Sequence, residues 1–267
     1  MHRKSQGAFE YILLLGGVLL IVVVSIIILR GSVLNQANKQ VVGNVNAWQN
    51  TVCIPTYLGD SAAVGVWHFE NDAQDSSGKE NHGTLMNGAT FGKGKHGKGI
   101  NLTTTAYRYV RVEDSLSLDL TNAFTLEAWV KPNTGDNPVL GKEDGTALAY
   151  NMGTPAALML YLNTDTLNPA DWNYGYSVSM PSGIWLHIAT TWDGTTVKYY
   201  EDGILKYTNP NSYTGTLVNS ASALGIGKNG DQTGGNARYY AGLIDEAIIY
   251  NRALSQSEIQ QDMNCAG

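Results

Sequence analysis

The sequence predicts a mainly β protein in which a long N-terminal α-helix is followed by an antiparallel β-sandwich or barrel. Two observations predict the β domain: short runs of β-branched and aromatic residues follow one another from about residue 60, and Gly, Asn and Asp separate them. A third observation predicts the helix, because residues 11–29 form one apolar run without a charged side chain.

Composition excludes two classes of protein. Charged residues make up 15% of the 267 residues, against about 25% in an average domain, which excludes a long disordered chain. The chain holds 17 Lys and Arg against 23 Asp and Glu, for a formal net charge of −6. No basic field is therefore available to bind nucleic acid.

The apolar run at 11–29 is long enough to cross roughly 30 Å of hydrocarbon as a helix. Arg3 and Lys4 precede it, which places the N-terminus in the cytoplasm and the rest of the chain outside. No site with small residues follows the run, so cleavage as an ordinary secretory signal peptide is not expected. Apolar residues then recur at spacings of three and four as far as Trp48, so we expect one helix and stalk over 6–52.

The segment SQGAFEYILLLGG, residues 5–17, resembles the class III signal peptide of archaeal type IV pilins. That resemblance implies a leader at 1–5, cleavage between Ser5 and Gln6 by a prepilin peptidase, and a filament-assembly role for Glu10. The family often has Ser where this chain has Ala8. The alternative is a plain single-pass anchor whose Glu10 reaches the membrane interface.

The chemistry of a buried carboxylate supports the pilin interpretation. In a bundle of apolar helices Glu10 needs a charged partner, and cleavage before Gln6 creates an α-amino group nearby. Gly16 and Gly17 offer a small surface for close helix packing. The expected partners are therefore other pilin subunits, with the protein in the cytoplasmic membrane before assembly and in a surface filament afterwards.

Cys53 and Cys265 are the only cysteines, and they flank the β region. If the topology above is right, both lie outside the cytoplasm, where disulfides persist. A bridge between them would close a loop of about 210 residues and place the ends of the domain side by side. Two free thiols are the alternative.

The elements of the β domain can be placed in order. Asp193-Gly194 and Asp202-Gly203 are strong hairpin signals. Near the C-terminus, Ser255 and Glu258 form a capping box for one short helix. The expected strands lie at 107–112, 124–132, 185–192 and 197–203.

Several runs, in order, resemble the laminin-G-like members of the concanavalin A-like lectin/glucanase superfamily. They are VWHFEND (66–72), DSSGKENHGTL (75–85), FGKGKHGKGINL (91–102), residues 109–132, residues 183–203 and YAGLIDEAIIYNRALSQSEI (240–259). The resemblance implies a jelly-roll sandwich of two antiparallel sheets over 53–267, with adjacent chain ends.

The same resemblance implies a calcium site. Glu70, Asp75 and Asn81 follow the first strand, and Asp245 is the matching acid near the last strand. Carboxylate and amide oxygens are the ligands that calcium prefers. The alternative is that Asp75 and Asn81 are ordinary turn residues that bond their own backbone, and that Asp245 bonds a neighbouring loop.

Two further features bear on ligands. Trp172, Tyr174 and Tyr176 lie in one loop and could stack on sugar rings, or Trp172 could simply close the sandwich edge. The segment GKGKHGKG is not expected to bind phosphate, because the following residues alternate like a strand. Asn101 begins the only N-glycosylation sequon.

Catalysis is not expected. No E-x-D-x-x-E run of paired carboxylates is present, and the five histidines show no metal-binding spacing. The two resemblances imply an archaeal type IV pilin-like filament subunit that displays a laminin-G-like domain for adhesion to glycans or surfaces. Alternatives are a membrane-anchored lectin-like receptor that does not polymerise and, least favoured, a surface glycan hydrolase.

Overall fold

A computed structural model describes residues 53–133, 137–143, 148–154, 158–165 and 180–265. The chain divides into two units, Met1–Cys53 and Ile54–Gly267, and the account below concerns the second unit. The leader, the long N-terminal helix and Glu10 all lie outside the described residues and stay predictions. Within the part of the chain that is described, no helix is both long enough and apolar enough to span a membrane.

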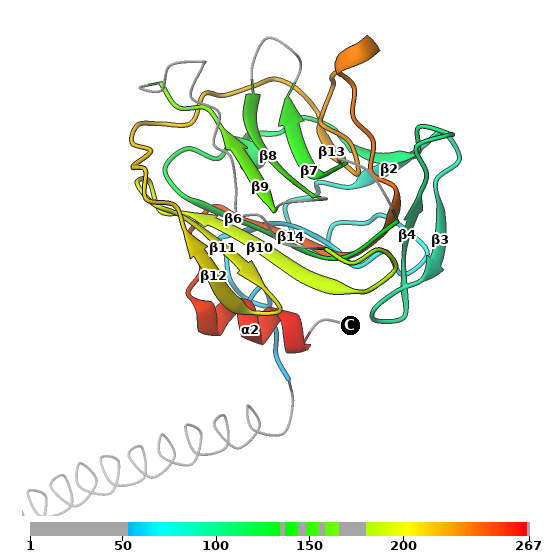
Figure 1. Cartoon of the computed structure of the whole chain (residues 1–267), viewed down its shortest axis with the longest axis horizontal. Coiled ribbons are helices and arrows are strands. Elements are labelled where there is room, and N and C mark those ends of the chain that lie inside the picture. The colour runs from blue at the N-terminus through cyan, green and yellow to red at the C-terminus, as the bar shows by residue number, and fades with distance from the viewer. Residues whose placement is uncertain (1–52, 134–136, 144–147, 155–157, 166–179, 266–267) are drawn as a thin grey trace, which may run out of the picture. The chain divides into compact units, whose positions relative to one another are not determined.

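The second unit is built from two antiparallel sheets that face one another (Figure 1). The larger sheet has eight strands in the order β12-β11-β10-β6-β14-β4-β3, with β1 also paired to β14. The smaller sheet has six strands in the order β2-β5-β13-β7-β8-β9. This arrangement confirms the predicted antiparallel sandwich and is consistent with a jelly roll.

The bounds of the strands are as follows. The eight-stranded sheet contains β1 (Ala63–Trp67), β3 (Thr90–Lys93), β4 (Lys98–Leu102), β6 (Phe124–Pro132), β10 (Leu186–Trp192), β11 (Val197–Glu201), β12 (Ile204–Thr208) and β14 (Gly242–Tyr250). The six-stranded sheet contains β2 (Gly83–Met86), β5 (Tyr109–Val112), β7 (Asn137–Glu143), β8 (Leu148–Thr154), β9 (Met159–Leu162) and β13 (Leu224–Ile226). Two short 3₁₀ turns, η1 (Leu116–Leu118) and η2 (Gly234–Asn236), lie in the connections.

The main core fills the space between the two sheets. Alternate residues of β6 point into it, among them Phe124, Leu126 and Val130. Trp192 of β10 pairs with Phe124 in register and is fully buried beside it. Burial of such large apolar side chains is the main source of stability for a sandwich of this kind.

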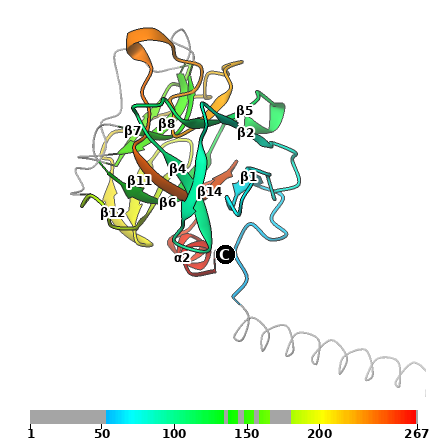
Figure 2. The same cartoon turned by 90° about the vertical axis from the view of Figure 1, so that its right-hand side faces the viewer.

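β14, the last strand in the sequence, lies near the middle of the larger sheet. It pairs with β6 along one edge and with β4 and then β1 along the other (Figure 2). The first and last strands of the domain are therefore neighbours, as the adjacent chain ends of the resemblance require. Cys53 and Cys265 form a disulfide, which confirms the predicted bridge.

The second face of the eight-stranded sheet is covered by α2 (Gln256–Cys265), below β10, β11 and β12 in Figure 1. The predicted capping box is confirmed, because Glu258 Oε2 accepts the Ser255 N–H at 2.7 Å and Ser255 Oγ accepts the Glu258 N–H at 3.4 Å. Ile259 packs with Ile248 and Tyr250 of β14 in a second apolar cluster. The central strands of the larger sheet are thus buried on both faces.

The local turn signals also agree with the structure. Asp193-Gly194 joins β10 to β11, and Asp202-Gly203 joins β11 to β12. The carboxylate of Asp193 accepts the N–H groups of Thr195 and Thr196, which fixes the first of these turns. The GKGKHGKG segment forms the β3–β4 hairpin and runs into a strand rather than a helix, as expected.

Candidate functional site

The outer face of the six-stranded sheet carries a turn that lies flat on it. Gly141 of β7 and Gly225 of β13 are register partners, and neither has a side chain to hold the turn away. A Cβ at Gly141 would lie 2.9 Å from Asn229 Cα, and one at Gly225 would meet the Lys228 carbonyl. The two glycines therefore allow Lys228 and Asn229 to be carried directly over the sheet.

Glu143 is the buried acid of this face, with 8% of its surface exposed. Its two carboxylate oxygens accept hydrogen bonds from the side-chain amides of Asn229 and Asn151, the latter at 3.3 Å. Burial raises the pKa of Glu143, and the amide hydrogen bonds oppose that rise. Asn229 Oδ1 in turn accepts the Arg238 N–H at 2.8 Å, which ties the segment before β14 to the same place.

Three tyrosines gather near Lys228, and we call Tyr107, Tyr109 and Tyr239 the tyrosine face. The ring of Tyr239 lies 5.0 Å from that of Tyr107 and 6.0 Å from that of Tyr109. Tyr107 is 59% exposed, so its ring faces solvent. The Lys228 ammonium lies 5.1 Å from the Tyr109 ring and 5.8 Å from the Tyr239 ring.

The Lys228 ammonium is held in place by backbone groups. It donates to the carbonyls of Gly230 and Gln232 at 2.5 and 2.8 Å. Burial lowers the pKa of Lys228, and the nearby carboxylate of Asp231 opposes this. The two tyrosine rings beneath it are therefore fixed from one side by a buried cation.

Arg111, Glu113 and Asp231 form paired charges on this face. Arg111 Nε donates to Glu113 at 2.9 Å, and another guanidinium nitrogen pairs with Asp231. These acids raise the pKa of Arg111 above its usual value. Asp231 also accepts the Ala223 N–H at 2.9 Å. Positive and negative groups thus neutralise one another beside the exposed rings.

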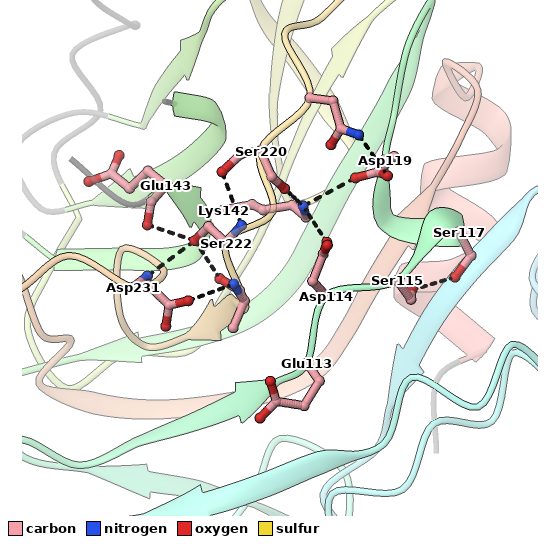
Figure 3. A network of polar contacts seen from close by, with 12 residues as sticks. Glu113, Asp114, Ser115, Ser117, Asp119, Lys142, Glu143, Ser220, Ser222 and Asp231 are labelled. Atoms are coloured by element: carbon pink, nitrogen blue, oxygen red, sulfur yellow. Dashed lines mark hydrogen bonds and ion pairs between the residues drawn. The ribbon is translucent and has the colours of Figure 1, made fainter. Parts of the chain in front are cut away.

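A network centred on Lys142 supports the face from below (Figure 3). The Lys142 side chain is fully buried, and its ammonium lies 2.7 Å from Asp114 and 3.2 Å from Asp119. It also donates to the Ser220 carbonyl. Because a buried charge is costly unless it is paired, this lysine fixes the β5–β6 connection and the segment before β13 relative to β7.

Ser222 links that network to the outer face. Its hydroxyl donates to the Glu143 carbonyl at 2.8 Å and accepts the Asp231 N–H at 3.3 Å, as the dashed lines in Figure 3 show. Ser222 therefore joins the backbone of Glu143 to that of Asp231, which fixes the positions from which their carboxylates project. A rigid polar surface with exposed rings is the arrangement that sugar rings can stack on.

The sequence analysis did not find this site. Its candidate ligand residues, Trp172, Tyr174 and Tyr176, lie outside the described residues and stay predictions. The signal for the tyrosine face was present in the strand at 107–112, where Tyr107, Tyr109 and Arg111 alternate. Tyr239 could not be added from spacing, because it comes from a distant segment that bridges to Lys228.

The structure separates the four predicted calcium ligands into two groups. Asp75 accepts the N–H groups of Val66, Ser77 and Asn81 at 2.8 to 2.9 Å. The Asn81 amide donates to the Val64 carbonyl at 2.6 Å. Both side chains are occupied by protein donors and acceptors, as the turn interpretation expects.

Glu70 and Asp245 instead meet at the tip of the β3–β4 hairpin. Glu70 accepts the Lys98 N–H at 2.8 Å, and Asp245 accepts the Lys95 and His96 N–H groups at 2.9 and 3.0 Å. Burial raises the pKa of Asp245 to about 7, against the effect of those N–H groups. Across the described ranges, no group of three or more His, Cys, Asp or Glu side chains is arranged as a metal site. Calcium binding stays a prediction.

Of the predicted glycosylation and processing sites, only the first lies within the described residues. Asn101 lies on β4 and is half-buried. Ser5, Gln6 and Glu10 lie outside the described residues. Glycosylation, cleavage and assembly therefore stay predictions.

Comparison with protein families gives one match. The model of the concanavalin A-like lectin/glucanases superfamily matches residues 104–260, more than half of the chain. A search of curated proteins found no match.

Solved structures share the fold. One is domain 4 of AbnA, a GH43 extracellular arabinanase from Geobacillus stearothermophilus, in complex with arabinotriose, with 24% identity and a TM-score of 0.57 over 77% of this chain and 98% of that chain. The binding domain of Paraclostridial Mosquitocidal Protein 1 has 18% identity and a TM-score of 0.56 over 76% of this chain and 52% of that one. The binding domain of Botulinum neurotoxin DC in complex with SialylT has 13% identity and a TM-score of 0.56 over 77% and 51%. The present chain thus spans about half of each toxin domain.

Proposed function

The chain belongs to the concanavalin A-like lectin/glucanases superfamily, and from this premise we propose that its β domain binds glycans through the tyrosine face. The observation that carries the proposal is the exposed Tyr107 ring, which packs against Tyr239 on the same face as the ion pairs of Arg111 with Glu113 and Asp231. A sugar ring has an apolar C–H face that stacks on such rings, while its hydroxyls bond to the polar groups around them. The AbnA domain, which was solved with arabinotriose, supports this ligand class.

Substitution of one exposed ring tests the proposal. Tyr107→Ala removes the ring and is expected to weaken glycan binding by about fivefold or more, because one aromatic contact contributes about 1 kcal/mol. Tyr107→Phe keeps the ring and is the matched control. Binding is measured on a glycan array and then by calorimetry with the full-length protein. Equal loss in both variants, or none in either, would contradict stacking on this face.

We also propose that the domain is displayed on the cell surface by an archaeal type IV pilin-like segment. The leader would be 1–5, cleavage would fall between Ser5 and Gln6, and Glu10 would guide packing with other pilin subunits. Support comes from the sequence resemblance and from the disulfide between Cys53 and Cys265, since disulfides persist outside the cytoplasm. The localisation is therefore the cytoplasmic membrane before assembly and a surface filament after it.

Peptide sequencing of protein from native surfaces tests this second part. A mature chain that begins at Gln6, recovered from sheared filaments, supports a filament subunit. A chain that keeps Met1–Ser5 and stays in the membrane supports the alternative, an anchored lectin-like receptor. Either result leaves the glycan-binding proposal open to its own test.

We propose no catalytic activity for the tyrosine face. A glycan hydrolase needs one carboxylic acid and a second carboxylate across the scissile bond. Glu143 is a buried acid of the same face, and both of its oxygens accept hydrogen bonds from asparagine amides, which gives it a structural role. Release of sugars from a panel of polysaccharides would contradict this proposal.

We propose that calcium, when bound, is held by Glu70 and Asp245. Both acids contact the tip of the β3–β4 hairpin, so the ion would supply charge that fastens the hairpin to β14. Calcium is expected to raise the melting temperature of the full-length protein, and Glu70→Gln to abolish that rise. An unchanged melting temperature and no heat in calorimetry would contradict calcium binding.

A further inference from the structure

A pocket of about 470 Å³ opens beside η1, between that turn and the first strand. Its size falls within the range of small-molecule sites, near the lower end. The residues that line it include Val64, Lys79, Leu116, Asp119, Asn122 and Asn251. Among the residues named for the tyrosine face and for calcium, none lines this pocket.

Asp119 gives the pocket a fixed polar wall. Its side chain is 13% exposed and is held by Lys142 at 3.2 Å through one oxygen and by Asn219 at 3.0 Å through the other. Figure 3 shows its carboxylate turned toward the Lys142 ammonium. Each carboxylate oxygen can accept a second hydrogen bond, so both can still receive a ligand hydroxyl.

Leu116 gives the pocket an apolar lip. It is 91% exposed, the largest exposed fraction among the large apolar residues of the described chain that are solvent-exposed. Val64 and Leu120, which also line the pocket, are buried and continue the apolar surface inward. One side of the pocket is therefore apolar, while Asp119, Asn122 and Asn251 supply polar groups.

We propose that this pocket binds one neutral sugar ring, as a free monosaccharide or as the end of a glycan chain. A sugar ring matches both walls, because its C–H face can cover Leu116 while its hydroxyls bond to Asp119 and the asparagine amides. The charge of Asp119 is balanced by the buried Lys142, and Lys79 is the cation at the pocket, so the pocket carries no strong field for an acidic sugar. The inference rests on the proposed function only for the class of ligand.

Pocket-filling variants test the proposal. Asn122→Trp fills the pocket from an exposed position, and Leu116→Ser removes the apolar lip where burial is not at stake. Ile204→Trp places the same ring on exposed β12 and is the matched control. Binding is measured by saturation-transfer NMR and calorimetry on the full-length protein, in a detergent without a sugar headgroup, with neutral monosaccharides, their methyl glycosides and linear oligosaccharides.

The expected result is loss of monosaccharide binding by about tenfold or more in Asn122→Trp, a smaller loss in Leu116→Ser, and none in Ile204→Trp. Binding of oligosaccharides without binding of the free sugar, with the same variant pattern, identifies the chain end as the ligand. If Tyr107→Ala loses monosaccharide binding and Asn122→Trp keeps it, the inference is overturned and the sugar lies on the tyrosine face. If no sugar binding responds to Asn122→Trp while Tyr107 variants weaken polysaccharide binding, the inference is overturned and the proposed function stands.

Discussion

The outer faces of the two sheets each contain a buried glutamate, and the two glutamates differ in their hydrogen-bond partners. On the eight-stranded sheet Glu127 lies on β6 beneath α2, with none of its surface exposed, facing Asp262 and 4.0 Å from His187. On the six-stranded sheet Glu143 is bound by two asparagine amides and lies at the edge of an open surface. Burial without a strong partner raises the pKa of Glu127 well above its usual value.

This difference separates a closed face from an open face. On the same face of the eight-stranded sheet, His187 Nδ1 and Trp129 Nε1 are also buried and have no hydrogen-bond partner among the described residues. On the open face the charges pair with one another beside exposed rings. The closed face is costly to build because it buries these polar groups, whereas the open face leaves the Tyr107 ring exposed to solvent.

The largest expected loss of stability comes from removing Lys142, whose buried network supports the open face. Lys142→Ala leaves Asp114 and Asp119 without their buried partner, so the free energy of unfolding should fall by about 3–5 kcal/mol. Urea denaturation of the full-length protein measures this change. Lys79→Ala, at an exposed lysine, is the control and should change little. Equal small effects would show that the buried network does not hold the face.

The second largest expected loss of stability comes from breaking the disulfide that holds α2 over the closed face. The disulfide ties α2 to Cys53, and Asp262 on the same helix accepts the Thr56 N–H. Cys53→Ser with Cys265→Ser should lower the free energy of unfolding by about 3 kcal/mol. Glycan binding by the folded variant should be unchanged, because the tyrosine face lies on the other sheet. A loss of binding in parallel with stability would erase the distinction between the faces.

The pH dependence of stability compares the two glutamates directly. A carboxyl whose pKa is raised on folding contributes stability that is present below its unfolded pKa of about 4.3 and is lost as pH rises through the folded pKa. Glu127→Gln removes this pH-dependent loss of stability. The variant should therefore become more stable relative to the wild type as pH rises above the unfolded pKa of about 4.3. Glu143→Gln should show a weaker trend, because its amide partners already oppose the raised pKa.

Thermal and urea unfolding between pH 4 and pH 8 measure these curves. Burial lowers the pKa of His187 to about 3. Its contribution to stability therefore increases as pH rises from about 3 to its unfolded pKa, opposite to the effect of Glu127. Because His187 lies 4.0 Å from Glu127, Glu127→Gln is compared with the wild-type residue in a His187→Gln background, which removes the His187 contribution. Parallel curves for Glu127→Gln and the wild type would contradict a raised pKa on the closed face.

Charge pairing on the open face should give the smallest effect. Arg111→Gln releases Glu113 and Asp231, and pairs that are partly exposed contribute only about 0.5–1 kcal/mol. The effect should shrink further in high salt, where surface charges are screened. Urea denaturation at two salt concentrations measures it. A loss as large as that of Lys142→Ala would mean that these pairs, too, are structural.

Local sequence signals predicted much of the fold. The features that could not be predicted depend on contacts between segments far apart in the sequence. β6 has the expected bounds, both Asp-Gly hairpins form, and Ser255 and Glu258 cap the one described helix, since neighbours in sequence determine these features. The burial of Glu127 could not be predicted in this way. Its strand alternates as if one face met solvent, and only the packing of α2 covers that face.

In the candidate site, too, local features could be predicted from the sequence and long-range contacts could not. Asp75 and Asn81 were weighed both as calcium ligands and as turn residues, and their hydrogen bonds follow the second interpretation. The tyrosine face depends on Gly141 and Gly225, which let a turn lie on the sheet and bring Tyr239 to Tyr107. Spacing along the chain carries no information about that approach, because it depends on pairing between strands far apart in sequence.

The disulfide has a mechanical consequence. A pull transmitted along the chain to Cys53 divides there, one part passing along the backbone to β1 and the other through the sulfur atoms to α2 and β14. β1 and β14 are hydrogen-bonded neighbours in the same sheet. Tension on the domain is therefore shared between two adjoining strands, and neither end of the sandwich can be peeled away alone while the covalent ring stays closed.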